Sequence, residues 1–140
     1  MHTTNQAKVI HASVDQVWNR IHDFHRLDWA PNVIEKVDKI GNLAGNVPGA
    51  KRLLNGAFAE TLLSLDEVNH QFKYSLDEGP SPISSHEVSN YIGTVQLNET
   101  GDGETEIVWT SSWEAKSDDA VEFCHGIYVA LMGDLDNSFH

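Results

Sequence analysis

The apolar positions in residues 117–139 recur at spacings of three and four, which is the pattern of an amphipathic helix. Asp119 and Glu122 have the spacing of a capping box at its start. We therefore predict a helix over Asp118–Phe139, about 33 Å long and able to cross a whole small domain. The apolar stripe consists of Ala120, Phe123, Cys124, Ile127, Leu131 and Leu135.

The last turns of this predicted helix contain features that weaken it. Asp134 and Asp136 lie near its negative end, where each costs up to about 1 kcal/mol. Gly126 and Gly133 add to the cost, and with Ala130 they form a face of small residues. That face indicates either a close backbone approach or room for another group. We expect the helix to fray beyond about Leu135 unless Leu135 and Phe139 dock on the sheet or on a second subunit.

The N-terminal region predicts one short strand followed by two short helices. Residues Gln6–Ala12 form the strand candidate. Ser13 and Gln16 then make a capping box that opens a helix over Ser13–Phe24. A second helix is expected over His25–Trp29, because Pro31 would end it.

Between residues 33 and 115 the apolar period changes to two, which indicates strands. Asn55-Gly56 is a strong hairpin signal between two of them. The predicted strands are Val33–Ile40, Lys51–Leu54, Phe58–Asp66, a segment around Phe72, Tyr74 and Leu76, His86–Leu97 and Thr105–Ala115. This order predicts an α+β fold in which a curved antiparallel sheet wraps around the C-terminal helix. A curved sheet and one helix cannot fill all the space between them, so we also expect a cavity.

Composition narrows the class of protein. A length of 140 residues predicts one domain, 1–140. The net charge of −12 disfavours binding to nucleic acid and to anionic membranes, since both attract Lys and Arg. The single cysteine excludes an internal disulfide, and we expect Cys124 to act as a small buried hydrophobe. No apolar run of spanning length or signal peptide is recognisable, so we expect a cytoplasmic protein.

Five segments together resemble the SRPBCC, or START-like, helix-grip superfamily, and most closely its bacterial polyketide cyclase/dehydrase-like members. The segments are SVDQVWNRIHDFHRLDWAP (13–31), ETLLSLDEVNHQFKYSL (60–76), SNYIGTVQL (89–97), IVWTSSW (107–113) and HGIY (125–128). The resemblance implies a helix-grip fold and a cavity that binds a small hydrophobic or aromatic ligand. It also implies that loops 54–57 and 78–85 surround the cavity mouth.

The same resemblance assigns residues to the cavity. It places Glu60 and Tyr91 inside as candidate catalytic residues. Phe72, Tyr74, Leu76, Tyr91, Trp109, Phe123, Ile127 and Leu131 are the expected ligand-binding residues.

The strand patterns leave the direction of two carboxylates open. Glu60 shares a face with Phe58 and Leu62, whereas the opposite face, with Leu63 and Leu65, is the more apolar. The alternation alone therefore turns Glu60 outward, and only the resemblance turns it inward. In 105–115 the resemblance turns Glu114 inward, but alternation turns Ile107, Trp109, Ser111 and Trp113 inward. We prefer the alternation there, because exposing two Trp side chains forfeits roughly 1.5–3 kcal/mol or more each.

The eight histidines do not predict a metal site. His22 and His25 are three residues apart on a predicted helix, but no third ligand lies at a recognisable spacing. His86 and His125 fall at the expected loop mouth and helix. No phosphate loop, dinucleotide fingerprint or catalytic triad spacing is found, so we expect neither a metal nor a cofactor.

Three functions are consistent with the sequence. The leading one is binding of a small, largely apolar molecule between sheet and helix. The second is a cofactor-free cyclase, dehydratase or isomerase with Glu60 as acid or base. The third is a protein–protein interaction module that uses the small-residue face, with a second copy of the chain as a candidate partner.

Overall fold

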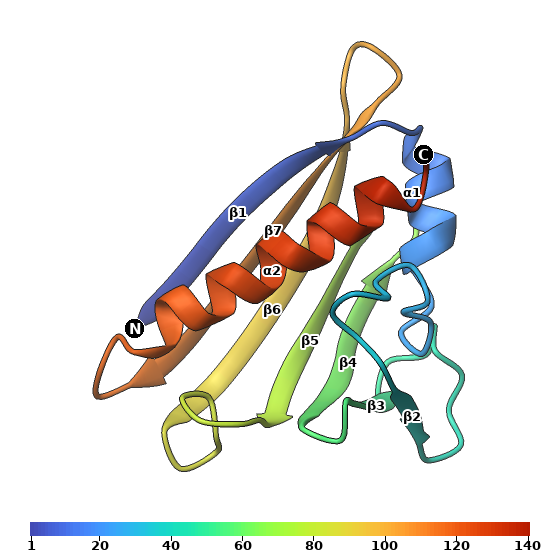
Figure 1. The fold of residues 1–140 in the computed structure, drawn as a ribbon. Coiled ribbons are helices and arrows are strands. Elements are labelled where there is room, and N and C mark those ends of the chain that lie inside the picture. The colour runs from blue at the N-terminus through green and yellow to red at the C-terminus, as the bar shows by residue number, and fades with distance from the viewer.

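Seven antiparallel strands form one curved sheet in the computed structural model, which describes residues 1–140. The long helix α2 lies across one face of this sheet, and α1 packs at the end where α2 finishes (Figure 1). The strands follow the spatial order β1-β7-β6-β5-β4-β3-β2. Their bounds are β1 His2–Ile10, β2 Val37–Ile40, β3 Lys51–Leu54, β4 Phe58–Asp66, β5 Gln71–Glu78, β6 Val88–Glu99 and β7 Thr105–Ala115. The helices are α1 Val14–Ile21 and α2 Ala120–Asn137. A curved antiparallel sheet around a C-terminal helix is the architecture that the sequence predicted.

The region after α1 differs from the prediction. The capping box of Ser13 and Gln16 forms, but α1 ends at Ile21, and no helix forms over His25–Trp29. The backbone N–H of Phe24 instead bonds to the carbonyl of Gly45, and the N–H of His25 bonds to the Asp23 carboxylate. Five residues are too few to form a stable helix alone, so these non-helical partners for the backbone prevail.

Two bulges decide which strand residues face the core. In β4 the pairing with β5 shifts between Leu62 and Ser64, so that Leu63 has no partner. Leu62 and Leu65 consequently both face inward, whereas Leu63 is 44% exposed. Because a bulge changes the facing of every later residue in the strand, simple alternation was the wrong guide here.

The bulge in β6 lies between Ser89 and Ile92, where Asn90 adopts a positive φ of 54°. Val88 and Tyr91 therefore both point into the core. In β7 the alternation is regular, and Ile107, Trp109, Ser111 and Trp113 are buried as the pattern predicted.

Both polar and apolar contacts hold the end of α2. Asp134 accepts hydrogen bonds from the backbone and side-chain N–H groups of Asn32, at 2.8 and 2.9 Å. Leu135 is fully buried, and the Arg20 guanidinium lies 3.9 Å from the centre of the Phe139 ring. The carboxylates that are unfavourable near the negative end of the helix dipole thus accept hydrogen bonds from other parts of the chain. Leu135 is buried as expected, but Phe139 packs against Arg20 of α1 rather than on the sheet, and α2 continues to Asn137.

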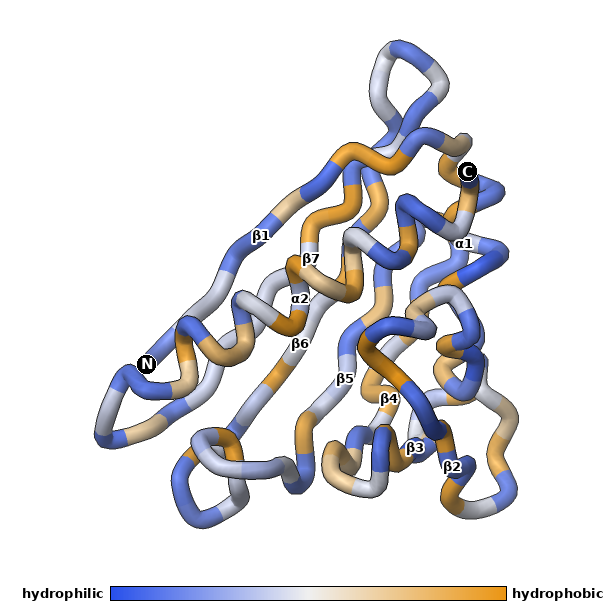
Figure 2. The backbone as a smooth tube through the Cα atoms, in the orientation of Figure 1, coloured by the Kyte–Doolittle hydropathy of each residue, from blue (hydrophilic) through white to orange (hydrophobic).

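The predicted capping box at the start of α2 does not form. Asp119 is the N-cap residue, but its side chain makes no capping hydrogen bond. Hydrophobic and hydrophilic stretches follow one another along α2 (Figure 2). Neither helix is long and apolar enough to span a membrane.

The small-residue face of α2 is open. A methyl group added at Gly126 or Gly133 would meet no atom within 4 Å. We therefore expect Gly126→Ala to raise the free energy of unfolding by about 0.5–1 kcal/mol through helix propensity alone. Urea denaturation would measure this. A loss of stability would show that another surface packs on this face, as the protein–protein interaction hypothesis requires.

Candidate ligand-binding cavity

A cavity of about 180 Å³ lies between α2 and the inner face of the sheet. Strands β3 to β7, the segment after α1 and the loop between β5 and β6 contribute its walls, and 14 of its 17 lining residues are hydrophobic. The lining residues are Leu27, Val33, Ile34, Arg52, Leu54, Asn55, Phe58, Glu60, Tyr74, Leu76, Ile83, Tyr91, Trp109, Cys124, Ile127, Tyr128 and Leu131.

The structure brings most of the expected site residues to this wall. Those that line it are Glu60, Tyr74, Leu76, Tyr91, Trp109, Ile127 and Leu131. Phe72 does not line it, because its ring packs within the aromatic cluster of Trp18, Phe24 and Tyr74. Phe123 does not line it either. The helix turns Cys124, Ile127, Tyr128 and Leu131 toward the cavity, which leaves Phe123 half-buried at the edge of that stripe.

The polar centre of the cavity is a set of three tyrosine hydroxyls, which we call the tyrosine cluster (Tyr74, Tyr91 and Tyr128). The Tyr128 hydroxyl lies 3.0 Å from that of Tyr74 and also contacts that of Tyr91. The indole N–H of Trp109 donates to the Tyr74 hydroxyl at 3.0 Å. Two contacts link three hydroxyls, so one hydroxyl proton is left for a further acceptor, which can be the neighbouring Cys124 sulfur or a ligand in the cavity.

Burial raises the pKa of each of the three phenols, so they stay neutral hydrogen-bonding groups at physiological pH. Aromatic packing holds them in place. Tyr91 stacks on Trp113 with ring centres 5.3 Å apart, and Tyr128 stacks on Trp109 at 5.0 Å. The Tyr74 ring lies against the backbone of Gly93, its partner across β5 and β6. The cluster is therefore rigid before any ligand arrives.

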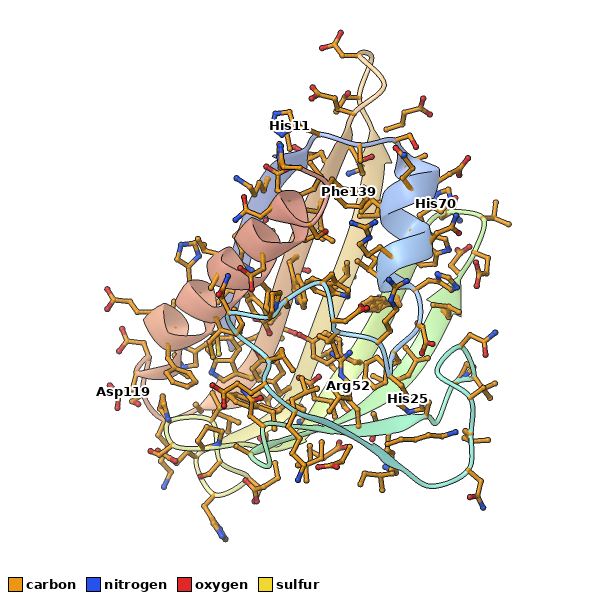
Figure 3. The ribbon with its side chains drawn as sticks, turned by 45° about the vertical axis from the view of Figure 1, so that its right-hand side comes forward. His11, His25, Arg52, His70, Asp119 and Phe139 are labelled. Atoms are coloured by element: carbon orange, nitrogen blue, oxygen red, sulfur yellow. The ribbon has the colours of Figure 1, made fainter.

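A buried ion pair forms a second polar group in the wall. The Arg52 Nε and Nη2 atoms lie 2.8 and 2.7 Å from Glu60 Oε1, and both residues are less than a tenth exposed. Nη1 donates to the carbonyl of Phe24 at 2.9 Å, and the guanidinium lies 3.8 Å from the centre of the Phe24 ring. Figure 3 labels Arg52 in the interior and His25 further out. Burial raises the pKa of Glu60, and the positive charge of Arg52 opposes this rise.

The pairing of Arg52 with Glu60 follows from the hairpin. Asn55 and Gly56 both have positive φ, so the turn is tight and places residue 52 directly opposite residue 60. The Asn55-Gly56 turn signal in the sequence was sufficient to predict this contact, but a single Arg in a short strand is normally expected to be exposed. Glu60 and Arg52 are the only charged residues of the lining, and together they are neutral.

Two loops contribute residues to the cavity wall, Asn55 from the β3–β4 turn and Ile83 from the loop between β5 and β6. The Asn55 side chain accepts hydrogen bonds from the backbone N–H groups of Glu35 and Lys36 and donates to the carbonyl of Val33. It thereby ties the segment before β2 to the hairpin. In the loop between β5 and β6, Ile83 is buried and reaches the cavity.

The remaining candidates lie outside the cavity. Glu114 is exposed and its carboxylate accepts a hydrogen bond from Asn90. His22 contacts the carbonyl of Trp18, whereas His25 contacts that of Lys51, so these two do not form a pair. His125 hydrogen-bonds to Gln6 on β1. Tyr128 was not among the expected site residues, although it lies four residues after Cys124 and so on the same helix face.

The family described as polyketide cyclase/dehydrase and lipid transport matches residues 1–138. A protein from Nitrosospira multiformis has 41% identity and a TM-score of 0.97, covering 99% of this chain and 97% of that one. XoxI from Bacillus cereus has 25% identity and a TM-score of 0.81, covering 99% and 96%. Norcoclaurine synthase from Thalictrum flavum, solved with dopamine and hydroxybenzaldehyde, has 20% identity and a TM-score of 0.76, covering 97% and 84%. No curated protein sequence matches the chain.

Proposed function

Because the chain belongs to the polyketide cyclase/dehydrase and lipid transport family, we propose that its cavity binds a small, uncharged, largely apolar molecule bearing one hydroxyl or carbonyl group. This proposal rests on the composition of the cavity wall. Its apolar surface favours an apolar ligand body, and the tyrosine cluster offers hydrogen bonds at one point. Arg52 is already neutralised by Glu60, so no free charge in the wall favours an ionic ligand.

The volume limits the size of the ligand. Pockets for drug-sized ligands measure about 300–1,000 Å³. The cavity here, at about 180 Å³, fits a compound with a single ring. Single-ring phenols are suitable first probes, and the hydroxybenzaldehyde in the norcoclaurine synthase structure shows that this fold has held one.

A pair of probes of nearly equal shape tests the proposal. p-Cresol and p-xylene differ only by a hydroxyl in place of a methyl group. We expect p-cresol to bind about 2–10-fold more tightly, which is the contribution of one net hydrogen bond. Titration followed by ¹H–¹⁵N NMR would measure both affinities, and the indole N–H signal of Trp109 reports on the cavity directly.

Ile127→Trp should abolish p-cresol binding because Ile127 lines the cavity and a larger side chain fills it. Val129→Trp is the matched control, since it lies on the same helix, is 47% exposed and does not line the cavity. Unchanged binding in Ile127→Trp, or equal losses in both variants, would refute the proposed site.

The catalytic hypothesis is the second candidate, and the raised pKa of Glu60 favours it. In this reading Glu60 takes up or donates a proton while Tyr74 or Tyr91 orients a ligand oxygen. A single-ring ketone such as 1-phenylpropan-2-one should then exchange its α-protons for deuterium faster with the protein than without it. Glu60→Gln should remove the acceleration. Absence of acceleration by the unaltered protein would reject Glu60 as a base for this class of compound.

A further inference from the structure

His11, Asp136 and His140 form a compact cluster on the outside of the molecule, away from the cavity. Each offers one ligand atom, and these atoms lie within 4.8 Å of one another. His11 follows the end of β1, whereas Asp136 and His140 are four residues apart near the end of α2. The ends of β1 and α2 meet at one end of the fold, where Figure 3 labels both His11 and Phe139. The sequence gives no hint of this meeting, because 125 residues separate His11 from Asp136.

From this cluster we infer a binding site for a divalent transition metal of the zinc class, with His11, Asp136 and His140 as ligands. The distances suit such an ion. His11 Nδ1 lies 3.1 Å from Asp136 Oδ1, and His140 Nε2 lies 3.5 Å from the same oxygen. Zinc with tetrahedral ligands at about 2.0–2.2 Å separates neighbouring ligand atoms by about 3.3–3.6 Å. All three ligand atoms lie within 4.8 Å of one another, so the exposed histidine side chains have to approach each other by at most about 1.5 Å to surround one ion.

The surroundings of the cluster support this assignment. His11 turns Nδ1 toward Asp136 and Nε2 toward Glu104, whose Oε2 lies 3.7 Å away. A metal-bound histidine commonly directs its other ring nitrogen to a carboxylate, which fixes its orientation. Glu104 is thus placed just beyond hydrogen-bond distance of His11 and close enough to support it when a metal binds. The net charge of the chain, −12, also favours a cation over an anion here.

The ligands are positioned before a metal binds. Asp136 is only 8% exposed, and its Oδ1 accepts the backbone N–H of His11 at 3.0 Å. Arg20 holds the residues before His140 through a 2.9 Å hydrogen bond to the Ser138 hydroxyl and its contact with the Phe139 ring. Both histidine side chains are more than half exposed, so an ion can reach them from solvent. A bound ion would tie the segment before α1 to the last turn of the helix that covers the cavity.

Isothermal titration of the full chain with ZnCl₂, after dialysis against EDTA, tests the site. We expect one ion per chain and no saturable binding of MgCl₂, because Mg²⁺ prefers oxygen ligands. At 100 times the dissociation constant, Zn²⁺ should raise the melting temperature by roughly 5–10 °C.

Variants separate this site from general surface binding. His11→Ala with His140→Ala should lose both the one-to-one binding and the thermal shift, and it should still fold because both side chains are largely exposed. Glu104→Gln should weaken binding on the order of 10–100-fold. His86→Ala, an exposed histidine outside the cluster, should bind as the unaltered chain does. Absence of saturable Zn²⁺ binding, or binding that survives loss of both histidines, would overturn the inference.

Discussion

Arg52→Met should lower the free energy of unfolding by about 3–5 kcal/mol, which is the usual cost of leaving one partner of a buried ion pair uncompensated. Arg52 is 5% and Glu60 8% exposed, so loss of the guanidinium leaves the Glu60 carboxylate largely desolvated. The substitution also removes the hydrogen bond to the Phe24 carbonyl and the contact with the Phe24 ring. Urea denaturation monitored by tryptophan fluorescence would measure the loss.

Two further variants show whether the loss comes from the unpaired carboxylate. Arg52→Met with Glu60→Leu replaces both charges by apolar groups, and we expect it to recover most of the stability. Lys51→Met is the matched control on the same strand, and its exposed side chain predicts a change within about 0.5 kcal/mol. A double variant as unstable as Arg52→Met alone would contradict the proposed cause.

The same ion pair changes what Glu60→Gln is expected to do. As an isolated buried carboxylate, Glu60 could be neutralised at little cost to stability. Since Glu60 instead holds Arg52 through two short contacts, Glu60→Gln leaves a buried cation with a weaker partner. The free energy of unfolding should therefore fall. Any loss of activity in Glu60→Gln has to be compared with the activity of the unaltered protein at the same folded fraction.

Gly93→Ala should destabilise the protein by about 1–3 kcal/mol or more, because the added methyl group overpacks the cavity wall. A Cβ atom at this position would lie within 2.5 Å of the Tyr74 hydroxyl oxygen. Tyr74 is 1% exposed and bonded to Trp109 and Tyr128, so its ring can move away from Gly93 only by breaking these hydrogen bonds and filling part of the cavity. The variant should also lose affinity for p-cresol through displacement of the tyrosine cluster.

A double-mutant cycle identifies the cause of this effect. In a Tyr74→Ala background, Gly93→Ala should cost little, because the ring with which the methyl group collides is gone. Gly101→Ala is the matched control in the turn between β6 and β7, where an added methyl group meets no atom within 4 Å. Equal costs of Gly93→Ala with and without the Tyr74 ring would show that the glycine is needed for some other reason.

Local periodicity was enough to predict most of the elements. The spacing of three and four predicted α2, and regular alternation predicted β7 with Trp109 and Trp113 inside. The Asn55-Gly56 pair predicted the hairpin between β3 and β4. These patterns depend on residues a few positions apart, whose relative directions are set by the geometry of a helix or a strand alone. The order of the elements, read with the family resemblance, was then sufficient for the fold.

The facing of Glu60, Leu63 and Tyr91 depended on the tertiary structure. A bulge inverts the alternation in β4 and another does so in β6, and both arise from pairing with neighbouring strands. The absence of a helix over His25–Trp29 has a more local cause, since the N–H groups of His25 and Arg26 both bond to Asp23, although Phe24 just before them bonds to the distant Gly45 carbonyl.

The chemistry of both proposed sites likewise arises from contacts between distant residues. Tyr128 meets Tyr74 and Tyr91 from the opposite wall of the cavity, 54 and 37 residues away in the chain. Asp136, which would only weaken an isolated helix, meets His11 at the end of β1. No local pattern encodes such meetings, because they follow from the register of the sheet and the path of α2 across it. The sequence alone therefore determined the elements and the apolar character of the core, and the tertiary structure decided which polar groups face one another.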